Sequence, residues 1–127
     1  IDSAAPVGDA LEQLALHDIG ALVVSTDGDR IDGLVSERDI ARGLRAHGPS
    51  LVDAPVGEIM CCDVMTCELT DGIEHLMAVM TEQRVRHLPV VDDDRLVGII
   101  SIGDVVKRRV DELEALHEQM VQYIQGR

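Results

Sequence analysis

The stretch "GLVSERD", Gly33 to Asp39, recurs later in the chain as "GIISIGD", Gly98 to Asp104. At this offset of 65 residues, identical positions are turn and polar residues, and conservative replacements fall at apolar ones. Upstream the offset becomes 66, and the change falls within the acidic turns "STDGDR" and "VDDDR", where an extra residue is tolerated. A chain of 127 residues can bury one compact core or two small half-domains that share a core. The sequence therefore predicts an internal repeat within one globule.

Apolar periodicity predicts the elements of each repeat. The first repeat is expected to form a helix over 7–17, strands over 21–25 and 31–36, and a helix over 37–46. The second is expected to form a strand over 63–67, a helix over 72–83, strands over 87–92 and 96–101, and a helix over 103–125. The predicted fold class is mixed α/β, with two pseudo-symmetric repeats, each a small sheet packed by two helices.

The repeat also predicts how the chain divides. The first repeat is assigned to residues 1–54, the second to 55–108, and a helical extension to 109–127. Counting back 66 residues places the counterpart of the strand at 63–67 before or at Ile1. The chain as given is therefore expected to begin partway through its first repeat. The two halves are expected to pack on each other about a pseudo-twofold axis.

Composition limits the partners. With 24 acidic and 11 basic residues, the formal net charge is −13, so the chain as a whole repels polyphosphate backbones and anionic membranes. Phe and Trp are absent and Tyr123 is the only aromatic residue, which leaves no stacking platform for single strands. No apolar run is long enough to span a bilayer, and no signal pattern opens the chain. We expect a cytoplasmic protein that binds neither nucleic acid nor membrane.

No metal site is expected from the sequence. Cys61, Cys62 and Cys67 lie in one short segment, without the second Cys or His pair that zinc spacing requires. Small buried or half-buried side chains on a strand in a reducing compartment are the plainer interpretation. The acidic turn "DGDRID" resembles a calcium loop, but Ile31 occupies a ligand position and no Glu closes it.

The repeated Ser and Asp allow two interpretations. Ser36 and Asp39, like Ser101 and Asp104, have the S-x-x-D spacing of a capping box at the start of a helix. Alternatively, the carboxylate can accept hydrogen bonds from both hydroxyls of a ribose diol, while free N–H groups at the helix end attract a phosphate. One such site holds both halves of a nucleotide.

Cations and glycines accompany each motif. Arg42 and Lys107 follow one turn after the Asp, and Arg38 adds a second positive charge in the first repeat. They form either surface pairs with the Asp or a phosphate contact that offsets the general negative charge. Gly33 and Gly98 could let the backbone approach a base closely, although a turn or bulge also explains them.

The segments "IGALVV…GLVSERDI" and "VRHLPVV…GIISIGDV" resemble the two halves of a cystathionine-β-synthase (CBS) domain pair, or Bateman module. The resemblance covers residues 7–106 and includes the linker "VGEIMCCDVMTCELTDGIEHLM". It implies a regulatory module that binds AMP, ADP, ATP, NAD or S-adenosylmethionine in clefts between the halves, without a required cofactor. By family position, the candidates for the adenine slots are Ile19 to Leu22 in the first repeat, with Gly20, Ala21 and Leu22, and Val85 to Pro89 in the second, with Arg86, His87 and Pro89; the sequence alone predicts buried strand starts there.

The two slots are predicted to be unequal. Arg86 and His87 stand where the first repeat has Gly20 and Ala21. Arg38 is expected to make the first site the stronger phosphate binder, and Arg86 is expected to compensate in part at the second. Whether His87 contacts a ligand or lies against the other half is left open by the sequence.

The last helix carries an apolar stripe at alternating steps of four and three: Val106, Val110, Leu113, His117, Met120 and Ile124. The stripe predicts a partner surface, and the resemblance implies a homodimer; the alternative is that the helix folds back over its own module. Two functions follow: a sensor of adenosine-containing nucleotides, or a dimerisation scaffold that binds no ligand. Enzymatic activity is not expected, because no Walker loop, metal cluster or activated nucleophile is found.

Overall fold

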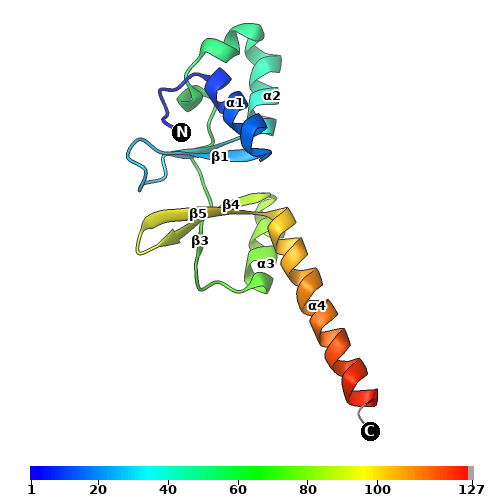
Figure 1. Cartoon of the computed structure of the whole chain (residues 1–127). Coiled ribbons are helices and arrows are strands. Elements are labelled where there is room, and N and C mark those ends of the chain that lie inside the picture. Colours follow the sequence, from blue (N-terminus) through cyan, green and yellow to red (C-terminus); the bar gives the residue numbers. More distant parts are fainter. Residues whose placement is uncertain (126–127) are drawn as a thin grey trace.

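The computed structural model describes residues 1–125 (Figure 1). The first repeat contains α1 (Val7–His17), β1 (Ala21–Val24), β2 (Gly33–Ser36) and α2 (Glu37–His47). Two short 3₁₀ helices, η1 (Pro49–Asp53) and η2 (Val56–Glu58), precede the second repeat. That repeat contains β3 (Cys67–Glu68), α3 (Ile73–Gln83), β4 (His87–Asp92), β5 (Arg95–Ser101) and α4 (Ile102–Gln125). The predicted order of helices and strands is confirmed, and so is the mixed α/β class.

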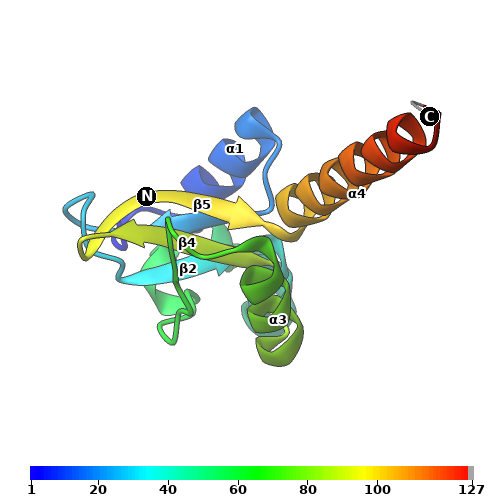
Figure 2. The ribbon, with the colours of Figure 1, turned by 90° about the horizontal axis from the view of Figure 1, so that it is seen from below.

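The strands form two small sheets. In the first, β1 and β2 are antiparallel; in the second, β4 lies between β3, which is parallel to it, and β5, which is antiparallel. The two sheets face each other, and the helices cover their outer sides (Figures 1 and 2). A backbone hydrogen bond of 3.0 Å from the Leu96 N–H to the Asp29 carbonyl joins the two halves.

The strand predicted over 63–67 is shorter and later than expected, because β3 consists of Cys67 and Glu68 alone. Upstream, Cys61 exchanges two backbone hydrogen bonds with Leu34 of β2, so the residues between must cross from one sheet to the other. In the first repeat, Ile1 takes the place that Cys67 of β3 has in the second, at the offset of 66. Its carbonyl accepts from the Ser25 N–H at 2.8 Å and its amino group donates to the Val23 carbonyl at 3.0 Å.

The buried residues form two clusters, one in each repeat. The first is the larger, and its members are Val7, Ala10, Leu14, Val24, Val35, Ile40, Leu51 and Val56. The second consists of Cys67, Leu76, Met80, Leu88 and Val105. The first cluster gains Leu51 and Val56 from η1 and η2, which pack back against the domain after α2 ends at Gly48. In the second repeat α4 continues as helix and supplies no such cover.

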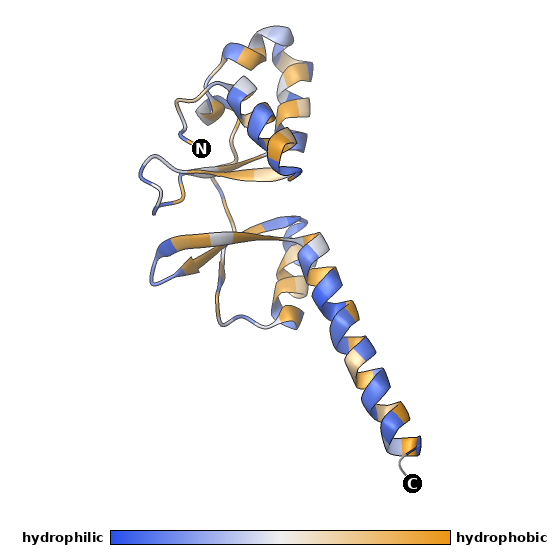
Figure 3. Cartoon of the chain, viewed as in Figure 1, coloured by the Kyte–Doolittle hydropathy of each residue, from blue (hydrophilic) through white to orange (hydrophobic). Residues whose placement is uncertain are grey.

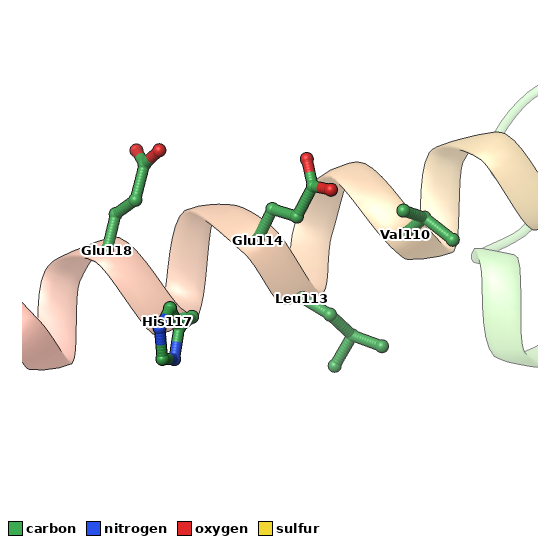
Figure 4. A pocket seen from close by; sticks show the side chains of 5 residues that line it. All are labelled: Val110, Leu113, Glu114, His117 and Glu118. Carbon is green, nitrogen blue, oxygen red and sulfur yellow. The ribbon is translucent and has the colours of Figure 1, made fainter.

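Helix α4 is 24 residues long and projects away from the module (Figure 1). The alternative that it folds back over its own module is therefore wrong. Apolar and polar residues alternate along it (Figure 3), and its stripe is exposed, from 46% at Val110 to 67% at Ile124. A hollow on its surface is lined by five residues of this one helix, so it is an open helix side rather than a cavity (Figure 4). No helix within residues 1–125 is long and apolar enough to cross a membrane.

Candidate functional site between the repeats

The same capping box begins α2 and α4. In each, the Asp backbone N–H donates to the Ser Oγ at 3.2 Å, and the Ser backbone N–H donates to the Asp Oδ2 at 2.9 Å. The Ser hydroxyl also donates to Oδ2 at 2.9 Å in both Ser36–Asp39 and Ser101–Asp104. The capping interpretation is therefore confirmed twice.

The capping hydrogen bonds use only one of the two oxygens of each carboxylate, and the other can accept a hydrogen bond from a ligand. Oδ2 carries both cap bonds, whereas Oδ1 of Asp39 and of Asp104 has no hydrogen bond to any residue the structure describes. The hydrogen bonds from Ser101, first the backbone N–H and then the hydroxyl, hold the pKa of Asp104 below its usual range. A group whose charged form accepts such bonds remains an acceptor at neutral pH. Capping and ligand binding are thus compatible in one side chain.

A pocket of about 460 Å³ opens at the junction of the two repeats around the start of α2. Its volume falls within the range of small-molecule sites. Residues of both repeats and of the linker line it: Gly20, Leu34, Ser36, Glu37, Arg38, Asp39, Arg42, Cys61, Arg84, Val85, Arg86 and His87. The pocket takes in the half-buried Asp39 and leaves the exposed Asp104 outside.

Four arginines distinguish this pocket in a chain of net charge −13. Arg38 and Arg42 come from the first two turns of α2, and Arg84 and Arg86 from the turn between α3 and β4. None of the four forms an ion pair within residues 1–125. Two acidic residues, Glu37 and Asp39, also line the pocket. The lining therefore carries four positive and two negative side chains, and both carboxylates lie in the first turn of α2.

The turn between α3 and β4 is fixed by its backbone. Arg84 ends α3 in the left-handed conformation, at φ 54°, and the Arg86 carbonyl accepts from the Ile102 N–H at 2.8 Å. In the first repeat the Gly20 carbonyl accepts from the Glu37 N–H at 3.0 Å in the same way. A Cβ on Gly20 would lie 3.3 Å from the His87 ring, so the absent side chain lets the two strand starts approach closely.

His87 both lines the pocket and lies against the first repeat. Burial is the main cause that lowers its pKa, and the Arg86 charge acts in the same direction. Glu37 and Asp104 raise the pKa, but the net direction is down. The ring is therefore neutral at neutral pH and offers one donor and one acceptor nitrogen.

The remaining predicted residues lie outside this pocket: Ala21, Leu22, Gly33, Pro89, Gly98, Ser101, Asp104 and Lys107. Ala21 and Pro89 are buried in their sheets. Arg86, which was expected to serve the second site, lines this pocket together with Asp39, and its role at either site stays a prediction. The sequence analysis missed four lining residues, Leu34, Glu37, Cys61 and Arg84. The sequence does distinguish Arg84, because the offset of 66 aligns this basic residue with the acidic Asp18 of the first repeat.

The cysteines differ in environment. Cys67 is buried on β3, as expected, and burial raises the pKa of its thiol. Cys61 and Cys62 are exposed, so the expectation of a buried or half-buried strand is wrong for them. Within residues 1–125 no three His, Cys, Asp or Glu side chains are grouped so that they could hold a metal ion.

Two stacked repeats, each with a helix that begins at a Ser–Asp capping box, define a tandem-repeat module. The profile of the CBS domain matches the chain twice, over residues 1–46 and 56–111. The chain belongs to the CBS domain family and consists of a tandem CBS pair, as the sequence predicts.

Relatives and solved structures agree with this assignment. The chain is 36% identical over 124 residues to the CBS domain-containing protein CBSX3, mitochondrial, of Arabidopsis thaliana, covering 94% of this chain and 60% of that protein. The CBS-domain containing protein ATU1752 from Agrobacterium tumefaciens has a TM-score of 0.81 at 38% identity, with 86% of both chains covered. The CBS domain pair of protein MJ0100, in complex with 5′-methylthioadenosine and S-adenosylmethionine, has a TM-score of 0.77 at 26% identity, covering 88% and 89%.

Proposed function

We propose that this chain is a regulatory module that binds an adenosine-containing nucleotide in the pocket beside Asp39. The observation that carries the proposal is the pocket itself: it is lined by a half-buried carboxylate with a free oxygen at the start of α2 and by four arginines without ion pairs, two from α2 and two from the turn before β4. A relative in the same family binds two adenosyl ligands, which supports this class of ligand. The chain acts by binding rather than by catalysis, and it requires no resident cofactor.

Each part of the pocket suits one part of a nucleotide. Oδ1 of Asp39 accepts from a ribose hydroxyl while Oδ2 keeps its cap bonds. The apolar side chains of Leu34 and Val85 flank the position of the base. Arg38 and Arg42, together with the positive end of the α2 dipole, attract a phosphate. Arg84 and Arg86 add positive charge from the other repeat.

Titration calorimetry with adenosine, AMP, ADP, ATP, NADH and S-adenosylmethionine tests the proposal. We expect AMP, ADP or ATP to bind more tightly than adenosine and to weaken with added salt, because the arginine contacts are electrostatic. A ligand at 100 times its Kd stabilises the fold by about 2.7 kcal/mol, so thermal shifts should follow the same order. Equal affinity for adenosine and AMP would show that no phosphate site exists, and no binding at all would reject the sensor.

The second candidate is a dimerisation scaffold that binds no ligand, and the exposed stripe on α4 favours it. We propose that this stripe forms a homodimer contact, whether or not a nucleotide binds. Replacing Leu113 and Met120 with Asp should yield a monomer by light scattering, with the circular dichroism spectrum unchanged. An unchanged dimer mass would exclude this contact.

A further inference from the structure

Helix α4 carries a charged residue on each side of its apolar stripe. The spacing of the stripe is that of a coiled-coil seam, and its members are Val106, Val110, Leu113, His117, Met120 and Ile124. In this spacing Arg109 takes position g, on one side of the seam, and Glu114 takes position e, on the other. The module covers neither the stripe nor Glu114, because every one of these residues is exposed.

Two copies of this helix can match all their stripe residues in only two ways. In a parallel pair in register, each stripe residue meets its own counterpart in the second copy. In an antiparallel pair, Val110 meets Met120 and Leu113 meets His117. Any other register leaves some stripe residues without a stripe residue opposite them.

The flanking charges distinguish these two arrangements. In a parallel coiled coil, position g of one helix lies beside position e of the next heptad in the other helix. Arg109 then lies beside Glu114 of the second copy, and symmetry makes this contact twice. In the antiparallel pair the e positions lie beside each other, so Glu114 of one copy meets Glu114 of the other. The parallel pair therefore has two attractive contacts, and the antiparallel pair has a like-charge contact.

We propose that α4 pairs in parallel with α4 of a second copy of this chain, as a two-stranded coiled coil that holds both modules at the same end. The inference rests on the homodimer contact proposed above and adds its direction and the residues that select it. An antiparallel pair would instead hold the two modules at opposite ends, with their pockets separated by the length of α4.

Arg109 is already held in place by its own module. Its Nη1 lies 3.7 Å from Oε1 of Glu74, which belongs to α3, and 3.7 Å from Oε2 of Glu112. A guanidinium has five N–H donors, so donors remain for a further carboxylate. Glu114 forms no ion pair with any residue from 1 to 125, and it gains one from the second copy.

His117 is a polar residue at a core position of the seam. In the parallel pair its ring meets the ring of the same residue in the second copy. A neutral imidazole has one donor and one acceptor nitrogen, so the two rings can share a hydrogen bond. In the antiparallel pair the ring would face Leu113, which offers no polar group. His117 therefore favours the same arrangement as the flanking charges, since a polar core residue fixes the register of a coiled coil.

Disulfide trapping measures the direction of the pair. The exposed Cys61 and Cys62 are first replaced by serine, and Val110→Cys and Met120→Cys are then introduced into separate chains. In a glutathione redox buffer, we expect each chain to form a disulfide with its own kind. A mixture of the two should contain no disulfide between residues 110 and 120, which lie about 15 Å apart along a helix. A disulfide requires Cα atoms within about 7 Å.

Charge reversal tests the flanking contacts. Glu114→Arg should weaken dimerisation at least about tenfold, because both contacts with Arg109 become repulsive. Adding Arg109→Glu to this variant should recover most of the lost affinity. Glu118→Arg is the matched control, since it makes the same change of charge one turn further along at a position outside the seam, and it should leave the dimer no weaker. Sedimentation equilibrium measures all three variants.

Two results would overturn the parallel direction: a disulfide that joins residue 110 to residue 120 as the main product of the mixture, or a dimer that Glu114→Arg leaves unchanged. The contact itself is judged by the variant with Asp at Leu113 and Met120. If that variant stays dimeric, or the unaltered chain is a monomer, the homodimer contact and the inference both fail. If that variant is a monomer but the disulfide joins 110 to 120, the contact stands and only the direction is wrong.

Discussion

The two repeats share their helix caps to within the same bond lengths and differ in almost everything around them. In the first, η1 and η2 cover the core and a single β-bridge at Cys61 covers the sheet edge; in the second, α4 continues as a helix beyond the module. The strand starts differ too, since Asp18, Gly20 and Ala21 stand where the second repeat has Arg84, Arg86 and His87. The two repeats thus share the Ser–Asp capping box at the helix start and differ in the strand-start residues near it.

The largest expected difference concerns the cores. Leu51 is 2% exposed in the first cluster, whereas its counterpart at the offset of 65, Leu116, is 53% exposed on α4. Leu51→Ala should lower the free energy of unfolding by about 2–5 kcal/mol, because it leaves a cavity. Leu116→Ala should change it by less than about 0.5 kcal/mol in dilute protein. Urea denaturation measures both, and similar losses would show that the second repeat is covered in solution.

The next prediction compares the two carboxylates. Asp39→Ala should weaken binding of AMP or ATP about 10- to 150-fold, the equivalent of the 1.5–3 kcal/mol that a charge-assisted hydrogen bond contributes. Asp104→Ala should spare the tighter binding event. The second variant is the matched control, because it loses the same capping box. Calorimetry that showed the reverse pattern would place the stronger site in the second repeat.

The sheet edges provide a further pair of variants. In Gly33→Ala the new methyl would lie 2.6 Å from the Met60 Sδ and 2.8 Å from the Cys61 carbonyl oxygen, so the linker must shift. We expect a loss of about 1–3 kcal/mol in the free energy of unfolding. Gly98→Ala meets nothing within 4 Å and should change it by less than about 1 kcal/mol. Thermal melts of the two variants measure both changes. If Gly98→Ala lowered the melting temperature as much as Gly33→Ala, the space beside Gly98 would be filled in solution.

The smallest expected effect is a pH dependence of the free energy of unfolding that His87 causes. The first repeat has Ala21 at this position, which does not titrate. Because its pKa is lowered by burial in the folded state, the unfolded chain binds the proton first as the pH falls. The stability that the neutral ring contributes is present above about pH 6.5 and is lost as the pH falls towards the folded pKa. His87→Gln should flatten the change in free energy of unfolding between about pH 7.5 and 5.5. An unchanged slope would assign the effect to other groups.

The elements were predictable because they depend on local pattern. Helix α1 and strand β4 have the bounds that periodicity predicts, and the S-x-x-D spacing gave both caps. The pocket was predicted only in part. Cys61 reaches it through pairing with Leu34, and Arg86 reaches it by crossing to the other repeat. Both depend on how the halves stack, which no local window of sequence contains.

The capped start of α4 is also the fixed end of a long lever. At 1.5 Å per residue, its 24 residues extend about 36 Å, most of it beyond the module. A tilt of about 10° at Asp104 would move the far end by about 6 Å, a distance close to one helical turn. A tilt at the junction that is too small to disturb the fold therefore produces a large displacement at the far end of α4. A partner surface that contacts the apolar stripe there would be displaced with it.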